Sequence, residues 1–452
     1  MHICPRCMKP SRMLPAHLLL ILFAASLPAC AGPIAWDSRV EIARGPGEKG
    51  PWEQNDSRYR YVDDPAVSIG PDGGAAVAWV DQARKDVFFQ LLSPQGRAQL
   101  PQALNVSRSG DTFSWLPRME RAPDAPERIY MLWQEIIFSG GSHGGDILFS
   151  RSDDNGRSFS QPINLSRSRA GDGKGRINAK VWHNGSLDLA AGPDGVLYAA
   201  WTEYEGGLWF SRSEDGGRRF SPPQRIAGGV GDKPARAPSL AVGKDRSVYL
   251  AWTTGEDEGA DIHVAASRDR GKRFGRPVIV AADDGYADTP KLAAGPDGAL
   301  HLVYAQSDGG PFARFQVHYT RSMDGGRTFE PSRAVSAPLP DSADSARYPY
   351  LGVDAAGRVA VVYELYPDYR REPRGLGISV SADGGHAFSE PEAVPHSADP
   401  EGGTNGSHQG WLMEKLDVTD DGSVAIANSS MAQGRQSRVW LIRGEMAAVS
   451  RR

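Results

Sequence analysis

Cysteine is scarce in this sequence, with 3 copies in 452 residues, and two of them, Cys4 and Cys7, lie close to the N-terminus. A zinc site built on this Cys-Pro-Arg-Cys pair would need a second pair of ligands, which the sequence lacks. The apolar run at residues 18–27 is too short to span a bilayer as a stable helix. Basic side chains (51) are fewer than acidic ones (55), which argues against a general attraction to nucleic acid or to an anionic membrane surface.

Motifs of several common catalytic classes are also absent. The sequence contains no His-Glu-x-x-His zinc motif, no phosphate-binding loop and no dense group of histidines. We therefore expect neither a cofactor nor a bound metal ion.

Glycine and proline, by contrast, are abundant, with 52 and 33 copies, which suits a turn-rich all-β protein. One pattern, Ser-x-Asp-x-Gly-x-x-Phe, recurs five times at spacings of 61, 54, 55 and 59 residues. The five copies are Ser152-Asp154-Gly156-Phe159, Ser213-Asp215-Gly217-Phe220, Ser267-Asp269-Gly271-Phe274, Ser322-Asp324-Gly326-Phe329 and Ser381-Asp383-Gly385-Phe388. Each copy suits a tight turn, because Asp accepts backbone N–H groups, Gly tolerates positive φ and Phe anchors the returning strand. The chain is therefore an array of one supersecondary unit.

The pattern resembles the Asp box, or BNR repeat, of the sialidase superfamily. The resemblance implies an all-β fold, a β-propeller of four-stranded blades in which Asp154, Asp215, Asp269, Asp324 and Asp383 have a structural role. Inner strands are predicted to start near Pro65, Pro117, Leu187, Pro238, Pro290, Pro349 and Glu414. Seven blades are therefore favoured, with the six of a sialidase as the alternative.

The last repeat unit provides only three strands. Residues 36–43 resemble the exit strand at residues 220–227, so we expect them to form the missing outer strand and to remove an exposed sheet edge. The propeller is then expected to span residues 36–446.

The position two residues before each inner-strand start changes its residue type from blade to blade, and it is expected to lie at the mouth of the central channel. Its occupants are Asp63, Trp115, Gly185, Arg236, Asp288, Arg347 and Leu412. Arg236-Ala237-Pro238 and Arg347-Tyr348-Pro349 resemble the Arg-Ile-Pro motif that provides a carboxylate-binding arginine in sialidases. The resemblance implies that Arg118, Arg236 and Arg347 bind a ligand carboxylate. It further implies Tyr348 or Tyr350 as nucleophile, Glu364 as its partner, and Asp63 or Asp288 as acid.

The sequence departs from the family pattern at two points. The first blade has no Arg-x-Pro, and Arg118 follows Pro117 instead of preceding it. Two interpretations of Arg236, Asp288 and Arg347 therefore stay open: an ion-pair cluster between blades, or a clamp for a ligand carboxylate. The long basic connection at residues 166–182 is a further candidate for ligand recruitment.

The leading functional interpretation is a protein that binds a glycan or another acidic small ligand, or else a protein partner, at the propeller mouth. An active exo-α-sialidase-type glycoside hydrolase is the first alternative. The second is a non-catalytic envelope scaffold.

Residues 1–29 resemble a lipoprotein signal peptide, with a basic segment followed by the apolar run. Leu27-Pro28-Ala29-Cys30 resembles a bacterial lipobox, which implies Cys30 as the lipidated first mature residue. Export to the bacterial cell envelope is expected, with the outer membrane favoured and the lipid as the only membrane contact. Ordinary cleavage near Ala31, giving a periplasmic or secreted protein, is the alternative.

Overall fold

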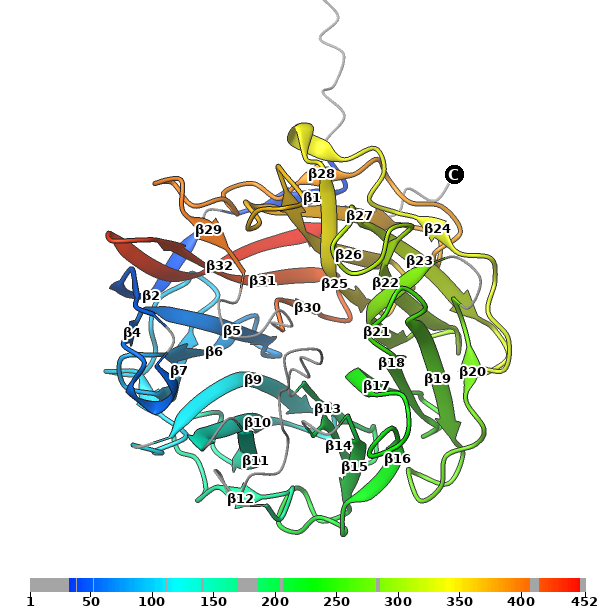
Figure 1. Ribbon diagram of the computed structural model, residues 1–452, viewed down its shortest axis with the longest axis horizontal. Coiled ribbons are helices and arrows are strands. Elements are labelled where there is room, and N and C mark those ends of the chain that lie inside the picture. Colours follow the sequence, from blue (N-terminus) through cyan, green and yellow to red (C-terminus); the bar gives the residue numbers. More distant parts are fainter. Residues whose placement is uncertain are drawn as a thin grey trace, which may run out of the picture. The chain divides into compact units, whose positions relative to one another are not determined.

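The computed structural model describes residues 32–447 apart from 38, 52, 111, 140–141, 169–185, 204–205, 282–284 and 407–413. The chain divides into two units, Met1–Gly32 and Pro33–Arg452, and everything below concerns the second. Its strands form seven blades around a common centre, a β-propeller (Figure 1). The predicted fold class and the favoured blade number are thereby confirmed. Among the described residues, no helix is long and apolar enough to cross a membrane.

Blades 1 to 6 are antiparallel sheets whose strands run in chain order from the centre outward. Blade 1 contains β5 (Val62–Ile69), β6 (Ala75–Asp81), β7 (Asp86–Leu92) and β8 (Leu104–Asn105); blade 2 contains β9 (Phe113–Ala122), β10 (Ala125–Ser139), β11 (Ser142–Ser152) and β12 (Ile163–Asn164). Blade 3 contains β13 (Leu187–Ala191), β14 (Leu197–Thr202), β15 (Leu208–Ser213) and β16 (Gln224–Ala227); blade 4 contains β17 (Ala235–Val242), β18 (Val248–Thr254), β19 (Asp261–Ser267) and β20 (Val278–Ile279). Blade 5 contains β21 (Tyr286–Ala294), β22 (Leu300–Ser307), β23 (Gln316–Ser322) and β24 (Arg333–Ala334); blade 6 contains β25 (Ser345–Val353), β26 (Val359–Tyr366), β27 (Leu376–Ser381) and β28 (Glu392–Ala393).

Blade 7 is assembled from both ends of the described chain. Its inner three strands are β30 (Leu416–Val418), β31 (Ser423–Ala432) and β32 (Gln436–Met446), and β29 (Thr404–Asn405) adds a short pairing to β31. Its outer edge consists of β1 (Ile34–Trp36) and β2 (Val40–Pro46), both antiparallel to β32. The N-terminal segment therefore closes the ring as expected, although it forms two short strands instead of one at residues 36–43.

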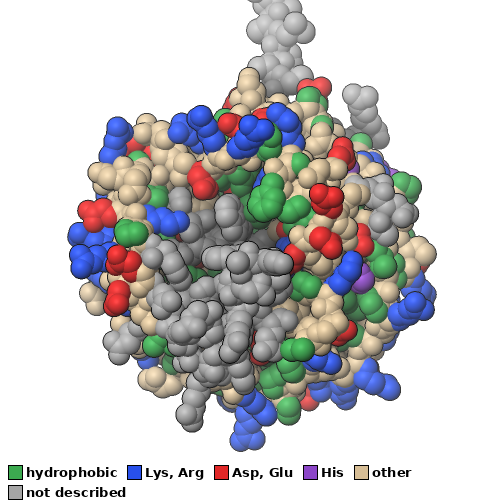
Figure 2. Space-filling model, in the orientation of Figure 1, with side chains coloured by type: hydrophobic (Ala, Val, Ile, Leu, Met, Phe, Trp, Pro, Cys, Tyr) green, Lys and Arg blue, Asp and Glu red, His purple; other side chains and the backbone are tan. Residues whose placement is uncertain are grey.

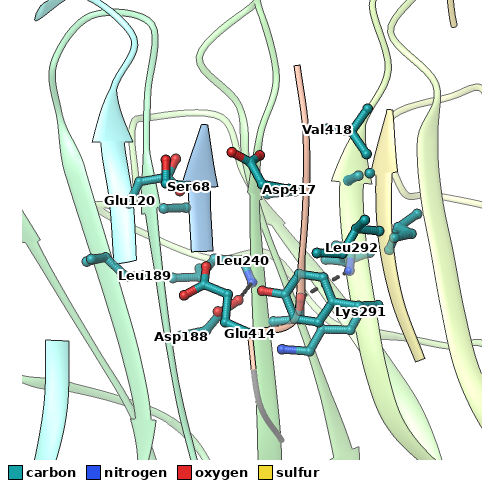
Figure 3. A pocket seen from close by; sticks show the side chains of 18 of the residues that line it. Ser68, Glu120, Asp188, Leu189, Leu240, Lys291, Leu292, Glu414, Asp417 and Val418 are labelled. Carbon is teal, nitrogen blue, oxygen red and sulfur yellow. Dashed lines mark hydrogen bonds between the residues drawn. The ribbon is translucent and has the colours of Figure 1, made fainter. Parts of the chain in front are cut away.

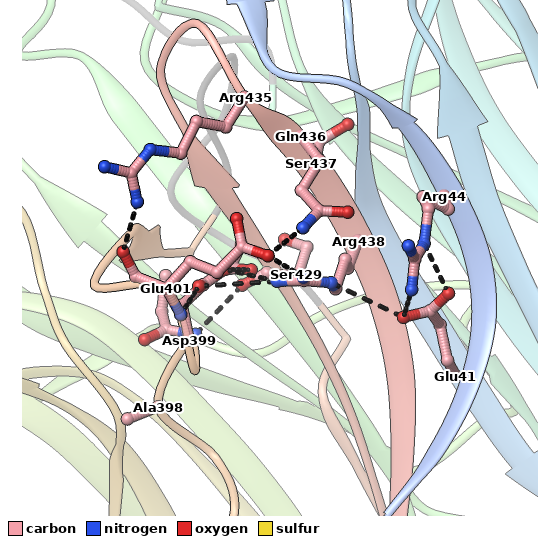
Figure 4. Close-up of polar contacts among 12 residues, drawn as sticks. Glu41, Arg44, Ala398, Asp399, Glu401, Ser429, Arg435, Gln436, Ser437 and Arg438 are labelled. Carbon is pink, nitrogen blue, oxygen red and sulfur yellow. Dashed lines mark hydrogen bonds and ion pairs between the residues drawn. The ribbon is translucent and has the colours of Figure 1, made fainter.

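A charged network holds this closing strand in place (Figure 4). Arg438 of β32 lies 3.4 Å from a carboxylate oxygen of Glu41 in β2, and the same guanidinium lies 2.7 Å from Glu401 and 3.4 Å from Asp399. Arg44 forms a second ion pair with Glu41 at 2.8 Å. Because Arg438 is almost fully buried, losing the closing strand would remove one of its three carboxylates.

The Ser-x-Asp-x-Gly-x-x-Phe repeats form one turn geometry. In all five copies the serine Oγ accepts a hydrogen bond from the glycine N–H at 2.7–2.9 Å, and the serine hydroxyl donates to the aspartate. The aspartate also accepts the N–H four residues further on. Hydrogen bonds from the Arg273 backbone and side chain lower the pKa of Asp269 to about 2. The carboxylate oxygens of these aspartates therefore accept hydrogen bonds within the turns, as a structural role requires.

The phenylalanine of the repeat packs against the preceding blade. Ring centroids of Phe159 and Phe89 are 5.0 Å apart, and Phe220 and Phe149 are 4.8 Å apart. Phe274 with Phe210 and Phe388 with Tyr319 repeat this edge-on contact. Each turn therefore joins neighbouring blades, so the repeat stabilises the ring as well as its own blade.

Candidate functional site

A distorted start to the inner strand places the mouth residues. In five blades the register of the inner strand shifts at the proline. The residue before that proline has a positive φ of 48–54° in each case; these residues are Asp64, Leu116, Ala237, Thr289 and Tyr348. Such a backbone is costly for residues other than glycine, and the ring imposes it repeatedly. The bulge is therefore part of the architecture, and by itself it marks no catalytic residue.

Arg236 is engaged by an ion pair between blades 4 and 5. Its Nη1 lies 2.6 Å from Oδ1 of Asp288, and its Nη2 donates to the Tyr286 hydroxyl at 2.8 Å. Burial alone would lower the pKa of Arg236, but Asp288 and Tyr286 together outweigh burial and raise that pKa. Asp288 also accepts from Thr253 at 3.0 Å. Arg236 and Asp288 therefore have the geometry of the ion-pair interpretation.

Arg347 has a different environment in blade 6. Its guanidinium lies over the Phe315 ring, 4.1 Å from the centroid, and 5.4 Å from that of Tyr366. Nη2 donates to the Ala313 carbonyl at 2.6 Å. No carboxylate of the described residues lies within ion-pair distance of it. Arg347 is thus a partly buried cation, oriented by aromatic rings and not neutralised by the part of the protein that is described.

The predicted tyrosine–glutamate pair takes another form. Glu364 is buried and accepts from Lys415 Nζ at 2.8 Å, a fully enclosed ion pair. The tyrosine hydrogen-bonded to Glu364 is Tyr366, at 3.2 Å, which the sequence analysis did not single out. The two residues are two positions apart on β26, so their side chains share one face. That spacing in the sequence could have identified Tyr366 as the partner of Glu364.

The tyrosines of this region have unfavourable pKa values for a nucleophile. Burial raises the pKa of Tyr366, and the Glu364 charge raises it further. Burial also raises the pKa of Tyr348, with Arg347 opposing and Asp288 reinforcing the shift. All these phenols are therefore protonated at neutral pH.

Asp63, Arg118 and Tyr350 lie away from this group. Asp63 has no exposed surface and accepts from Ser429 at 2.8 Å, which ties blade 1 to blade 7. Arg118 is buried and donates to the Leu187 carbonyl at 3.1 Å. Tyr350 lines the central channel. The three predicted arginines thus contact different sets of residues, and Gly185, Leu412, Cys30 and most of the basic connection lie outside the described residues.

The channel contains a cavity of about 250 Å³ that touches all seven inner strands. Figure 3 shows its polar residues in two groups, with Asp188, Glu414 and Lys291 in one part and Glu120, Asp417 and Ser68 in the other. None of the six was a predicted site residue. Among the described residues, no group of three or more His, Cys, Asp or Glu side chains is arranged to hold a metal ion.

Several of these side chains cap the inner edges of the sheets. An innermost strand has no neighbour on its channel side, so part of its N–H groups would be unpaired. Asp188 accepts from the Leu240 N–H at 2.7 Å, and Ser239 accepts from the Leu292 N–H at 3.0 Å. Glu414 accepts from the Met119 N–H at 2.6 Å. Burial raises the pKa of Glu414 to about 8. Acidic residues in the channel therefore have a structural role that connects blades.

Comparison with known proteins identifies the fold. No protein-family model matches the sequence, and no curated protein matches it significantly. A solved ulvan lyase shares 15% identity over 89% of this chain and 95% of its own, with a TM-score of 0.56. A protein of unknown function from Dyadobacter fermentans shares 14% identity over 92% of this chain and 100% of its own, with a TM-score of 0.53. An α-L-arabinanase of Penicillium chrysogenum shares 13% identity over 77% of this chain and 98% of its own, with a TM-score of 0.50. At this identity the likeness is one of fold.

Proposed function

We propose that this protein binds an acidic glycan at the mouth of its propeller through Arg347. The observation that carries the proposal is the guanidinium itself, which is partly buried, stacked on Phe315 and without a carboxylate partner among the described residues. A buried cation is stabilised by a counter-charge, and a planar guanidinium pairs in bidentate fashion with a carboxylate or sulfate group. A ligand with such a group would complete this site.

An exposed aromatic ring lies close to that guanidinium along the chain. Arg347 donates a hydrogen bond to the carbonyl of Ala313, and the adjacent residue, Phe312, is 88% exposed. An exposed ring on a connection between two strands of a blade offers an apolar face to a sugar ring. Figure 2 shows hydrophobic and acidic side chains side by side on this face, over β22 to β26. Arg347 would provide the charge recognition and Phe312 the stacking surface.

The fold likeness is consistent with a carbohydrate ligand. One solved ulvan lyase, at 14% identity and a TM-score of 0.55, is bound to a unit of glucuronic acid and sulfated rhamnose. The arabinanase is complexed with arabinobiose. The five turn repeats resemble the Asp box, and membership of the sialidase superfamily is part of the proposal.

Binding is favoured over sialidase-type cleavage. Hydrolysis by that chemistry would need three arginines around one point beside a reactive Tyr–Glu pair, whereas Arg236 is neutralised by Asp288 and Glu364 is paired with Lys415. We further propose export and lipidation at Cys30, which would present the mouth at the cell envelope.

The test compares Arg347→Ala with wild type by isothermal titration against ulvan, polygalacturonate and 3′-sialyllactose, with neutral dextran as the reference ligand. Wild type is expected to bind at least one acidic ligand and not dextran. Loss of Arg347 should weaken that binding by about 2–5 kcal/mol, the usual range for a hydrogen-bonded charge pair.

Arg314→Ala is the matched control, because Arg314 is an exposed arginine already paired with Asp344 at 2.5 Å. This change removes the same formal charge from a neighbouring position and should alter the affinity by less than about 0.5 kcal/mol. Equal effects of the two variants would mean that general charge, and not the Arg347 site, attracts the ligand. Turnover of a fluorogenic sialoside by wild type would instead support the hydrolase alternative.

A further inference from the structure

One position in the ring has a residue that the architecture does not explain. The residue after the inner-strand proline, or its counterpart, lines the channel cavity in four blades: Asp188, Ser239, Lys291 and Tyr350. Asp188 and Ser239 each cap a backbone N–H of another blade, as Glu414 does from the position of the proline itself. An ammonium group has no acceptor, so Lys291 is unable to act as such a cap.

Lys291 is held inside the channel without an acceptor. It is 5% exposed, and its Nζ lies 4.6 Å from the centroid of the Tyr350 ring. Among the described residues, none accepts a hydrogen bond from Nζ or forms an ion pair with it. Burial lowers the pKa of Lys291 to about 8, with Asp188 acting in the opposite direction. A buried polar group in this state is stabilised by a ligand that supplies the missing acceptors.

We propose that this part of the channel is a second binding site, separate from the mouth, that takes one neutral sugar ring or a polyol of similar size. Lys291 donates to its hydroxyl groups, and the free oxygens of Asp188 and Glu414 accept from them. Figure 3 shows these three side chains converging in the same part of the cavity. The volume of about 250 Å³ is shared by both ends of the channel, which leaves room for a single ring and not for a chain.

The charges of the lining select a neutral ligand. An anion would approach Lys291 but would also face the Asp188 carboxylate, and a cation would face Lys291 with Arg118 close to it. A hydroxyl group both donates and accepts, so one compound with several hydroxyls can satisfy the ammonium, the Asp188 carboxylate and the Glu414 carboxyl group together. This specificity is the opposite of that proposed for Arg347.

The experiment measures binding of free D-glucose, D-galactose and L-rhamnose to the purified protein by saturation-transfer NMR, with D-glucuronate as the charged counterpart. At least one neutral sugar is expected to bind with a Kd on the order of 1 mM, and glucuronate at least about tenfold more weakly. Lys291→Met should weaken the neutral sugar at least about tenfold.

Asp188→Asn provides a second variant that retains an acceptor for the Leu240 N–H and therefore preserves the cap. It should also weaken the neutral sugar. Ser68→Ala, in the other part of the channel, and Arg347→Ala, at the mouth, are controls that should leave the affinity unchanged.

The proposal is overturned if none of the neutral sugars binds, or if a sugar binds equally well to wild type, Lys291→Met and Asp188→Asn. Thermal melting of each variant establishes that it is folded. If Lys291→Met fails to fold, the affinity of Asp188→Asn for the neutral sugar tests the proposal. Loss of acidic-ligand binding in Arg347→Ala together with unchanged binding of the neutral sugar would show that the two sites are independent.

Discussion

At the scale of single residues, the mouth shows how one repeat position can have several roles. Four equivalent positions are occupied by Asp63, Arg236, Asp288 and Arg347. Asp63 is buried against Ser429, and Arg236 and Asp288 neutralise each other. Arg347 has no counter-charge among the described residues. The sequence identifies the position, because its residue type varies. The partners come from neighbouring blades, 52 residues away for Arg236 and Asp288 and 366 residues away for Asp63 and Ser429, so the sequence alone did not indicate which arginine is neutralised.

A second set of channel residues was overlooked for a similar reason. Lys291 and Asp188 lie just after the inner-strand proline or its counterpart, and this position varies as much as the one before it. The Arg-x-Pro resemblance directed attention to the preceding position, and at the following position only Arg118 and Tyr350 were candidates. A comparison of both positions would have identified Lys291.

The Glu364–Lys415 pair leads to a prediction at this scale. Lys415→Met leaves the buried Glu364 carboxylate without its cation, and the expected loss is about 3–5 kcal/mol in the free energy of unfolding. Glu364→Gln in the same chain removes the uncompensated charge and should restore most of that loss. Equilibrium unfolding in urea measures both, and a single variant as stable as wild type would contradict the role assigned to the pair.

At the scale of elements, the repeat allowed most of the fold to be predicted. Every expected inner-strand start lies in, or within two residues of, the innermost strand of a blade. The arginine before the repeat was missed: Arg151, Arg212 and Arg321 each donate to a carbonyl in the turn of the following blade, at 2.8, 3.2 and 2.5 Å. Blade 4 has Ala266 at this position, and Arg268 donates to the Gly325 carbonyl in its place at 2.6 Å. Blade 6 has Val380, and its neighbour, blade 7, has no such turn to bind. The pattern was visible, but its meaning depends on a contact between blades.

The closing strands carry the prediction at this scale. A chain that begins at Gly47 lacks β1 and β2, which exposes the edge of β32 and removes Glu41 from Arg438. We expect a large loss of thermal stability and aggregation in size-exclusion chromatography. A chain that begins at Pro33 retains both strands and should melt like the mature protein. Equal melting of the two would show that ring closure does not depend on these strands.

At the scale of the whole molecule, the repeat explains why the fold is easier to recognise than the function. The turns, the edge caps and the aromatic contacts between blades recur around the ring, so they determine a propeller whatever it binds. We propose that function depends on the few positions that break the repetition, namely Arg347 at the mouth and Lys291 in the channel. Fold likeness at 12–15% identity to polysaccharide lyases and an arabinanase leaves both positions to be tested directly.

The proposed anchor also belongs to this scale. Cys30→Ser should abolish labelling by a fatty-acid analogue and move the protein from the membrane fraction to the soluble fraction of the producing bacterium. Immunoblotting of the two fractions measures the change. A wild-type protein found in the soluble fraction would contradict lipidation and indicate ordinary signal cleavage.

The most direct measurement of the central claim is a crystal structure of the protein with a glucuronate-containing disaccharide. The proposal predicts a carboxylate oxygen within about 3.2 Å of the Arg347 guanidinium, with one sugar ring against Phe312 and the Arg236–Asp288 ion pair unchanged. A ligand bound elsewhere on the propeller, or one that displaces Asp288 from Arg236 and leaves Arg347 untouched, would contradict it.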